Sequence, residues 1–284
     1  MNAIPDTRPS PIAGTWYSDD PRELALQIDR FLSAADPGPI DGDVIALVAP
    51  HAGLRYSGRT AAHAFAAIAG QERKPVAVLS PFHNYHPAPV LTTLHAAYAT
   101  PLGRVPVCHD LLADVDSGLR RVGMSGLVQL AGDPEHALEI ELPFLQRALR
   151  NDLEIIPLMV RAHHPELCAR LGSILAEVLD GARALLVAST DLSHFHPERN
   201  ARALDTAVLE RIEQFDPAGI FAVQESGRGY ACGVGAVAAV LHAARRLGAD
   251  TVKIVHYSTS AAETGDASSV VGYGAAVIYR RKAI

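Results

Sequence analysis

Cysteine is scarce in this sequence, and its spacing excludes a disulfide-stabilised fold. Among 284 residues, only Cys108, Cys168 and Cys232 are cysteines. An odd number of widely spaced cysteines does not form a disulfide framework, and a chain of this length can bury a large core without one. We therefore expect an ordinary globular protein in a reducing, cytoplasmic environment.

Long apolar runs and clustered positive charge are missing as well. No segment approaches the ~20 consecutive apolar residues of a membrane span, and the N-terminal stretch MNAIPDTRPSPIAG lacks the apolar centre of a signal peptide. The chain has 25 basic and 31 acidic residues, a formal net charge of −6. These absences argue against a membrane or a nucleic acid as a partner.

Apolar patterning predicts strands that alternate with helices. Short, continuous apolar runs are typical of strands that are covered on both faces. The segment 21–35, PRELALQIDRFLSAA, instead repeats apolar residues at helical spacing, and its first proline suits a first helical turn. Helical patterns also separate the later runs. The strands predicted in this way are 43–49, 75–80, 153–160 and 182–190, with further strands near the C-terminus.

This alternation predicts one α/β domain over residues 1–284, with a mostly parallel central sheet and helices on both of its faces. The turn-rich segment 89–107 is expected to form a β-hairpin, which would make the sheet mixed. Pro143 is expected either to bend the helix over 136–149 or to mark its true start. Residues 1–20 are rich in proline and are expected to be largely irregular.

Three predicted strands end in the same way, with a histidine just beyond the strand. VIALVAPH ends in His51, VAVLSPFH ends in His83, and ALLVASTDLSH carries Asp191 and His194. Ligands of open α/β sheets bind beyond the carboxyl ends of the strands, and loops at that edge often carry function. One such histidine could simply bond a backbone carbonyl, but the repetition predicts a shared site.

Two further segments could add chemistry to this edge. Cys232 lies near the start of an apolar helix, where the helix dipole favours a thiolate; otherwise it is a small buried apolar residue. Imidazole and thiolate together suit iron, copper or zinc. In DPEHALEIELPF, His136 and Glu139 share a helical face and could orient a ligand histidine, or they belong to a solvated face. Glu141 is expected to point elsewhere.

Short motifs in a fixed order span nearly the whole chain: AGTWY, APHAGLRYSG, LSPFH, TPLG, DPEHALEIELPFL, IIPLMV, STDLSHF and ACG. With these motifs the chain resembles the Memo family, whose bacterial form is often labelled AmmeMemoRadiSam system protein B. The fold of that family is similar to the class III extradiol dioxygenases, which bind non-haem Fe(II) and cleave aromatic rings with O2. The resemblance therefore implies a class III extradiol dioxygenase-like α/β fold.

The resemblance also implies roles for individual residues. His51 of PHAG, His83 of SPFH and Cys232 of ACG are implied as metal ligands, with iron(II) expected first and copper or zinc as alternatives. Cys232 stands where the dioxygenases place a carboxylate, a departure from the usual ligand set of O2-activating iron. His194 is implied as the acid/base. Asp191 lies beside it, although Asp191 could instead cap the following helix.

Three aromatic residues near these motifs complete the predicted site. Trp16, Tyr17 and Tyr56 are expected to line a substrate pocket, or, for the first two, to anchor the N-terminus. The leading hypothesis is a mononuclear non-haem iron or copper oxidoreductase that acts on a small organic substrate. The alternatives are a non-catalytic metal- or peptide-binding protein and a zinc hydrolase. The family label implies a radical-SAM protein and an AMMECR-type protein as partners.

Overall fold

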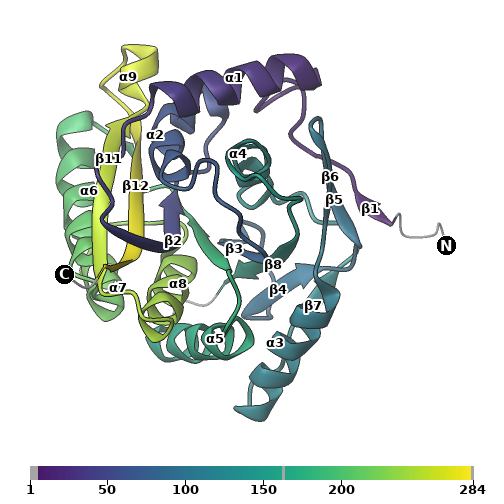
Figure 1. Ribbon diagram of the computed structural model, residues 1–284. Coiled ribbons are helices and arrows are strands. Elements are labelled where there is room, and N and C mark those ends of the chain that lie inside the picture. Colours follow the sequence, from purple (N-terminus) through teal and green to yellow (C-terminus); the bar gives the residue numbers. More distant parts are fainter. Residues whose placement is uncertain (1–5, 162–163, 283–284) are drawn as a thin grey trace.

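The computed structural model describes residues 6–161 and 164–282, and its centre is a nine-stranded mixed sheet. Figure 1 shows this sheet between two groups of helices. The strands follow the order β10-β12-β2-β9-β3-β8-β4-β7, and β11 also pairs with β12. The strands are β1 (Thr7–Arg8), β2 (Gly42–Ala49), β3 (Val76–Ser80), β4 (Val90–Thr93), β5 (Ala97–Thr100), β6 (Gly103–Pro106), β7 (Val128–Leu130), β8 (Ile155–Val160), β9 (Leu185–Ser189), β10 (His194–His196), β11 (Thr251–Thr259) and β12 (Val270–Arg281).

Four adjacent strands form the parallel part of this sheet. β2 pairs with β9, β9 with β3, and β3 with β8, all in the same direction. β3 and β9 are buried along their whole length, which explains why their sequences are continuous apolar runs. On either side, β12 and β4 run antiparallel to β2 and β8. The predicted α/β fold and the mixed character of the sheet are confirmed; four of its eight strand pairings are parallel.

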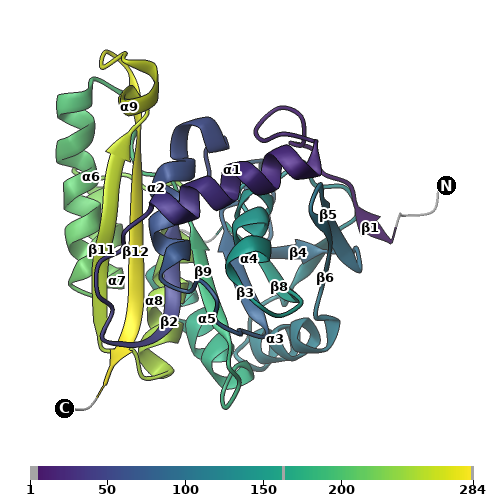
Figure 2. The ribbon, with the colours of Figure 1, turned by 45° about the horizontal axis from the view of Figure 1, so that its top comes forward.

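Helices cover both faces of the sheet, as predicted. α1 lies across α2 and α4 on one face, which is clearest in Figure 2. On the other face α8 packs against β9 and β3, and α5 and α7 pack against α8. The helices are α1 (Pro21–Ala34), α2 (Leu54–Ala66), α3 (His109–Arg121), α4 (Leu142–Ala148), α5 (Pro165–Val178), α6 (Glu198–Glu213), α7 (Pro217–Glu225), α8 (Val234–Arg246) and α9 (Ala261–Thr264), with a 3₁₀ turn η1 (Glu139–Glu141) before α4.

Three segments that the sequence left open or irregular form defined elements in the structure. Within 89–107, β5 and β6 form an antiparallel hairpin, and β1 joins it to make a separate three-stranded sheet. Pro143 lies in the first turn of α4, so it marks the start of that helix. The N-terminal segment, described from residue 6, contains the two-residue strand β1. None of the helices in the described ranges has the length and apolar composition needed to cross a membrane.

Candidate metal centre

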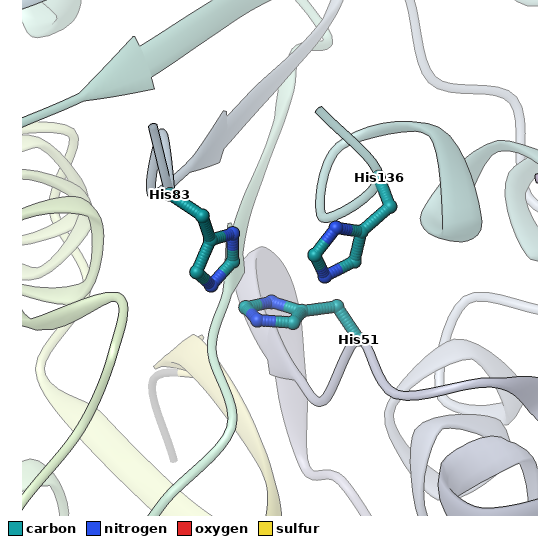
Figure 3. Close-up of side chains that lie close together, drawn as sticks. All are labelled: His51, His83 and His136. Carbon is teal, nitrogen blue, oxygen red and sulfur yellow. The ribbon is translucent and has the colours of Figure 1, made fainter. Parts of the chain in front are cut away.

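The parallel strands bring three predicted site residues to one edge of the sheet. β2, β9 and β3 are neighbours, so their carboxyl ends present His51, Asp191 and His83 side by side. A loop that precedes η1 adds His136 from another part of the chain. Figure 3 shows the imidazole rings of His51, His83 and His136 facing one another.

These three histidines form a compact cluster. One ring nitrogen from each lies within 4.8 Å of the others, and no other group of described histidine, cysteine or acidic side chains meets this criterion. His83 and His136 stack nearly parallel, with ring centroids 4.7 Å apart. His51 stands edge-on to both rings, at 5.4 and 5.6 Å between centroids. The sequence analysis expects His136 to orient a ligand histidine, and in the structure His136 lies in one cluster with His51 and His83.

Ser189 fixes the orientation of His51. The Ser189 hydroxyl lies 2.9 Å from Nδ1 of His51 and 2.6 Å from Oε1 of Glu141. The single hydroxyl proton goes either to Glu141 or to the carbonyl oxygen of Ala137, which also lies 2.6 Å away, so in both cases Ser189 accepts from Nδ1–H and Nε2 of His51 keeps its lone pair. Burial, followed by the charges of His136 and His83, lowers the pKa of His51 well below its ordinary value. His51 is therefore a neutral imidazole whose lone pair is on Nε2, the nitrogen that lies 3.2 Å from Sγ of Cys232.

Glu135 orients the other two histidines. Its Oε1 accepts a hydrogen bond from Nδ1 of His83 at 2.9 Å and lies 3.4 Å from Nδ1 of His136. Its Oε2 accepts from the backbone N–H of His83 at 2.6 Å. Although burial opposes the charge, the His83 and backbone N–H donors hold the pKa of Glu135 down at about 2. The carboxylate thus binds Nδ1 of His83, and its Oε1 also accepts the backbone N–H of His136 at 2.9 Å, which leaves Nε2 of both rings available.

The protonation of the two imidazoles differs. Burial lowers the pKa of His136 to about 4, against the charge of Glu135. Burial also lowers the pKa of His83, but the hydrogen bond and charge of Glu135 outweigh it, so the net shift is upward. At neutral pH His136 is a neutral imidazole that can donate a lone pair. A larger fraction of His83 is protonated, and that fraction has to lose a proton before its nitrogen can bind a metal.

Cys232 lies beside Nε2 of His51 and is not a member of the three-imidazole group. Its Sγ is 3.2 Å from Nε2 of His51 and accepts the backbone N–H of Asp191 at 3.2 Å. Burial, and then the charge of Asp191, raises the pKa of this thiol. Gly233 allows the close approach, because a Cβ there would lie 2.4 Å from the carbonyl oxygen of Ser189. The role of Cys232 as a metal ligand stays a prediction. Its sulfur and Nε2 of His51 are close enough for both atoms to bind one metal ion.

Asp191 and His194 both line the cleft beside the cluster. Oδ1 of Asp191 accepts the backbone N–H of His51 at 2.8 Å, which ties the ends of β9 and β2 together. Burial raises the pKa of Asp191 to about 7, although the N–H groups of His51 and Ala52 oppose the shift. Burial, and then the charge of His83, lowers the pKa of His194. Two groups able to exchange protons near neutral pH therefore lie at the same opening.

A cleft of about 700 Å³ opens onto the cluster. Trp16 and Tyr56 line it, as predicted, and the Trp16 ring lies 4.2 Å from that of His136. The side chain of His83 is 37% exposed, so the cluster can be reached from this opening. The volume suits a small organic molecule.

Tyr17 and Glu139 do not reach the imidazole cluster. Both are buried, and the Tyr17 hydroxyl donates a 2.5 Å hydrogen bond to Oε1 of Glu139. Glu139 also pairs with Arg8, whose guanidinium binds Asp133 and the carbonyl oxygen of Glu135. Glu139 lies in the 3₁₀ turn η1, after the loop that carries His136, so α-helical spacing does not place the two side chains together. Tyr17 and Glu139 support the loop that carries Glu135 instead of lining the cleft.

Four residues that hold the cluster or its supporting loop had no predicted role in it. Glu135 directly precedes His136, and Ser189 ends the strand that leads to Asp191, so adjacency was a usable signal for both. Glu141, expected to point elsewhere, accepts the Ser189 hydroxyl. Arg8 gave no signal, because its carboxylate partners lie 125 and 131 residues away.

The donor set fits a transition metal. Each imidazole has Nδ1 next to an oxygen and Nε2 left over, the arrangement that orients histidine ligands in metalloproteins. Imidazole suits iron, copper and zinc, and the neighbouring thiol adds a soft donor. Nothing in this set singles out one of these metals.

The chain is similar to known proteins over nearly its whole length. The family model described as "Memo-like protein" matches residues 8–277. The MEMO1 family protein of Methanopyrus kandleri is 32% identical over 280 residues, covering 95% of this chain and 98% of the relative. That of Methanothermobacter thermautotrophicus is 34% identical over 271 residues, covering 92% and 96%. With a matching family model and relatives that both span nearly its full length, the chain belongs to the Memo family.

Proposed function

We propose that the protein is a metal-dependent oxidoreductase that binds iron(II) at the imidazole cluster and acts on a small organic molecule in the adjoining cleft. One observation carries the proposal: His51, His83 and His136 converge at the base of an accessible cleft, and Ser189 and Glu135 fix Nδ1 of His51 and of His83. This orientation requires polar side chains to be buried beside the rings. A bound metal would give the converging nitrogens a partner. Copper is the alternative redox metal.

The residues divide into metal holders and proton carriers. His51, His83 and His136 would hold the metal, with Cys232 as a further donor on the His51 side. When bound, the metal supplies Lewis-acid and redox chemistry to a molecule in the cleft. His194 can accept a proton at neutral pH because its pKa is lowered. Asp191 can hold or release one because its pKa is about 7. Trp16 covers His136 and limits access of water.

Metal analysis tests the proposal directly. Protein purified without oxygen should contain about one redox-active metal per chain, and His83→Ala should lose it, because His83 presents its free nitrogen to the cluster. His86→Ala is the matched control: this neighbouring histidine lies outside the group of three and accepts a backbone N–H from Ala88. Absence of redox metal in the parent, or its retention in His83→Ala, would overturn the proposal.

Glu135→Gln tests the orientation of the cluster. The amide keeps the shape of the carboxylate but removes the charge that engages His83 and His136. We expect metal affinity to fall by about 10–100-fold, the usual effect of losing an outer partner of ligand histidines. Competition with a chromogenic chelator measures it. Glu154→Gln, which alters the Lys74 pair at the surface, should leave the affinity unchanged. Equal affinity in Glu135→Gln and the parent would show that Glu135 does not orient the ligands.

A zinc hydrolase is the second candidate, because three histidines are also a catalytic zinc donor set. Zinc at one per chain, with ester hydrolysis and no O2 consumption, would favour it over the oxidoreductase. The radical-SAM and AMMECR-type partners and the cytoplasmic location remain predictions from the family resemblance.

A further inference from the structure

Phe195 is held in an unusual conformation at the mouth of the cleft. It has a φ of 61°, in the left-handed region that bulky side chains rarely adopt. It also interrupts the pairing of β10 with β12: His194 faces Val271 and His196 faces Val270, so Phe195 is an extra, bulged residue. Backbone strain of this kind persists where the surrounding structure enforces it, often at functional sites.

The side chain gains no packing in return. Phe195 is 77% exposed, among the most exposed large apolar residues in the described chain, yet it lines the cleft. Its ring lies 5.7 Å from that of His194, the proton carrier of the proposed mechanism. Phe195 is unfavourable in the free protein for two reasons, the positive φ of its backbone and the exposure of its apolar ring to water. A ligand that covers the ring would remove the second of these.

The rest of the cleft indicates what kind of ligand that is. Trp16 and Tyr56, from two other parts of the chain, add aromatic surface, and Tyr56 is 38% exposed. Tyr273 also lines the cleft and is 2% exposed. Aromatic surface beside the polar side chains of Asp191 and His194 suits a flat ring that carries a polar substituent.

We propose that Phe195 is a specificity-determining residue, whose ring packs on the flat face of a ring-bearing small molecule while the polar end of that molecule reaches the imidazole cluster. The bulge serves to aim the side chain over the cleft instead of letting it continue the strand. This inference rests on the proposed function in one respect, that the cleft is a substrate site. It does not depend on which metal is bound.

The chain supplies its own reporter for a binding experiment. Trp16 is the single tryptophan and lies in the cleft, so its fluorescence reports occupancy. The probe is 4-nitrophenol, which quenches tryptophan by energy transfer, added to the full-length protein as purified. Benzyl alcohol should displace the probe better than cyclohexylmethanol, which has a similar size but no flat ring.

Phe195→Gly separates binding from folding. Glycine adopts a positive φ without strain, so the melting temperature should equal or exceed that of the parent. Affinity for 4-nitrophenol should nevertheless fall about fivefold, the size of one lost aromatic contact. Phe195→Tyr keeps the ring and should bind within twofold of the parent. Leu94→Gly removes a large apolar residue that is 40% exposed, lies outside the cleft and has no positive φ, so it should lower the melting temperature and leave binding intact.

Three results would overturn the inference: no quenching by 4-nitrophenol in the parent, unchanged affinity in Phe195→Gly, or equal displacement by the two alcohols. Metal analysis of the same samples separates this from the proposed function. Ring binding through Phe195 in a protein without a redox metal would support the inference while the oxidoreductase proposal fails.

Discussion

Replacing Arg8 with methionine should lower the free energy of unfolding by about 3–5 kcal/mol, the usual consequence of leaving buried charges without their partner. The guanidinium is 1% exposed and lies 2.8 Å from Oδ1 of Asp133 and 2.5 Å from Oε2 of Glu139. It also donates to the carbonyl oxygen of Glu135 at 2.6 Å. Without it, two carboxylates and a carbonyl would remain buried with fewer donors. Chemical denaturation of both proteins measures the loss.

Two comparisons show whether unpaired charge causes this loss. Adding Asp133→Asn and Glu139→Gln to Arg8→Met removes the stranded charges and should restore a large part of the stability. Arg147→Met breaks a two-point ion pair with Asp29 that is exposed to solvent, so it should cost only about 0.5 kcal/mol. An Arg8→Met protein as stable as Arg147→Met would show that the buried network contributes little.

The position of Arg8 links stability to the site. The same guanidinium that neutralises Asp133 and Glu139 holds the backbone of Glu135, whose carboxylate engages His83 and His136. The N-terminal segment is therefore a support for the loop that carries half of the cluster. In the milder triple variant, metal affinity should stay below that of the parent even where the stability has recovered, because the carbonyl of Glu135 has lost its donor.

The histidines at strand ends were predictable from local sequence. The apolar runs before His51 and His83 identify buried strands, and parallel strands place their carboxyl ends at one edge. The order of the strands in the sheet could not be read from the sequence. Any order that makes β2, β9 and β3 neighbours would nevertheless bring these residues together. The α/β class and the helix at 21–35 follow from equally local rules, whereas for Pro143 two interpretations stayed open until the structure placed it in the first turn of α4.

The contacts that orient the histidines were not predictable in the same way. Glu135 meets His83 across 52 residues and Ser189 meets His51 across 138, and both contacts depend on how loops settle over the finished sheet. Glu139 shows how a local rule fails: helical spacing from His136 was expected, but the segment forms a loop and then a 3₁₀ turn. A periodicity argument holds only where the element it assumes is present.

Cys232→Ser should reduce Co²⁺ affinity by at least about 100-fold, the upper end for outer partners of metal ligands, if the thiol is a direct donor. The geometry supports this role, since Sγ lies 3.2 Å from Nε2 of His51 and the N–H of Asp191 points at the sulfur. The raised pKa of the thiol means that it is protonated in the free protein, so a metal has to displace that proton on binding. The parent should therefore release a proton and gain a thiolate-to-cobalt charge-transfer band, and the serine variant should show neither.

Two further variants serve as comparisons for Cys232→Ser. Cys108→Ser changes a partly buried cysteine that is not part of the histidine cluster and should keep both the affinity and the band. His136→Ala should weaken Co²⁺ binding while keeping the band, because it removes an imidazole and leaves the sulfur in place. A parent protein that binds Co²⁺ without the band would assign the site to the three imidazoles alone, with Cys232 as a hydrogen-bond partner of His51.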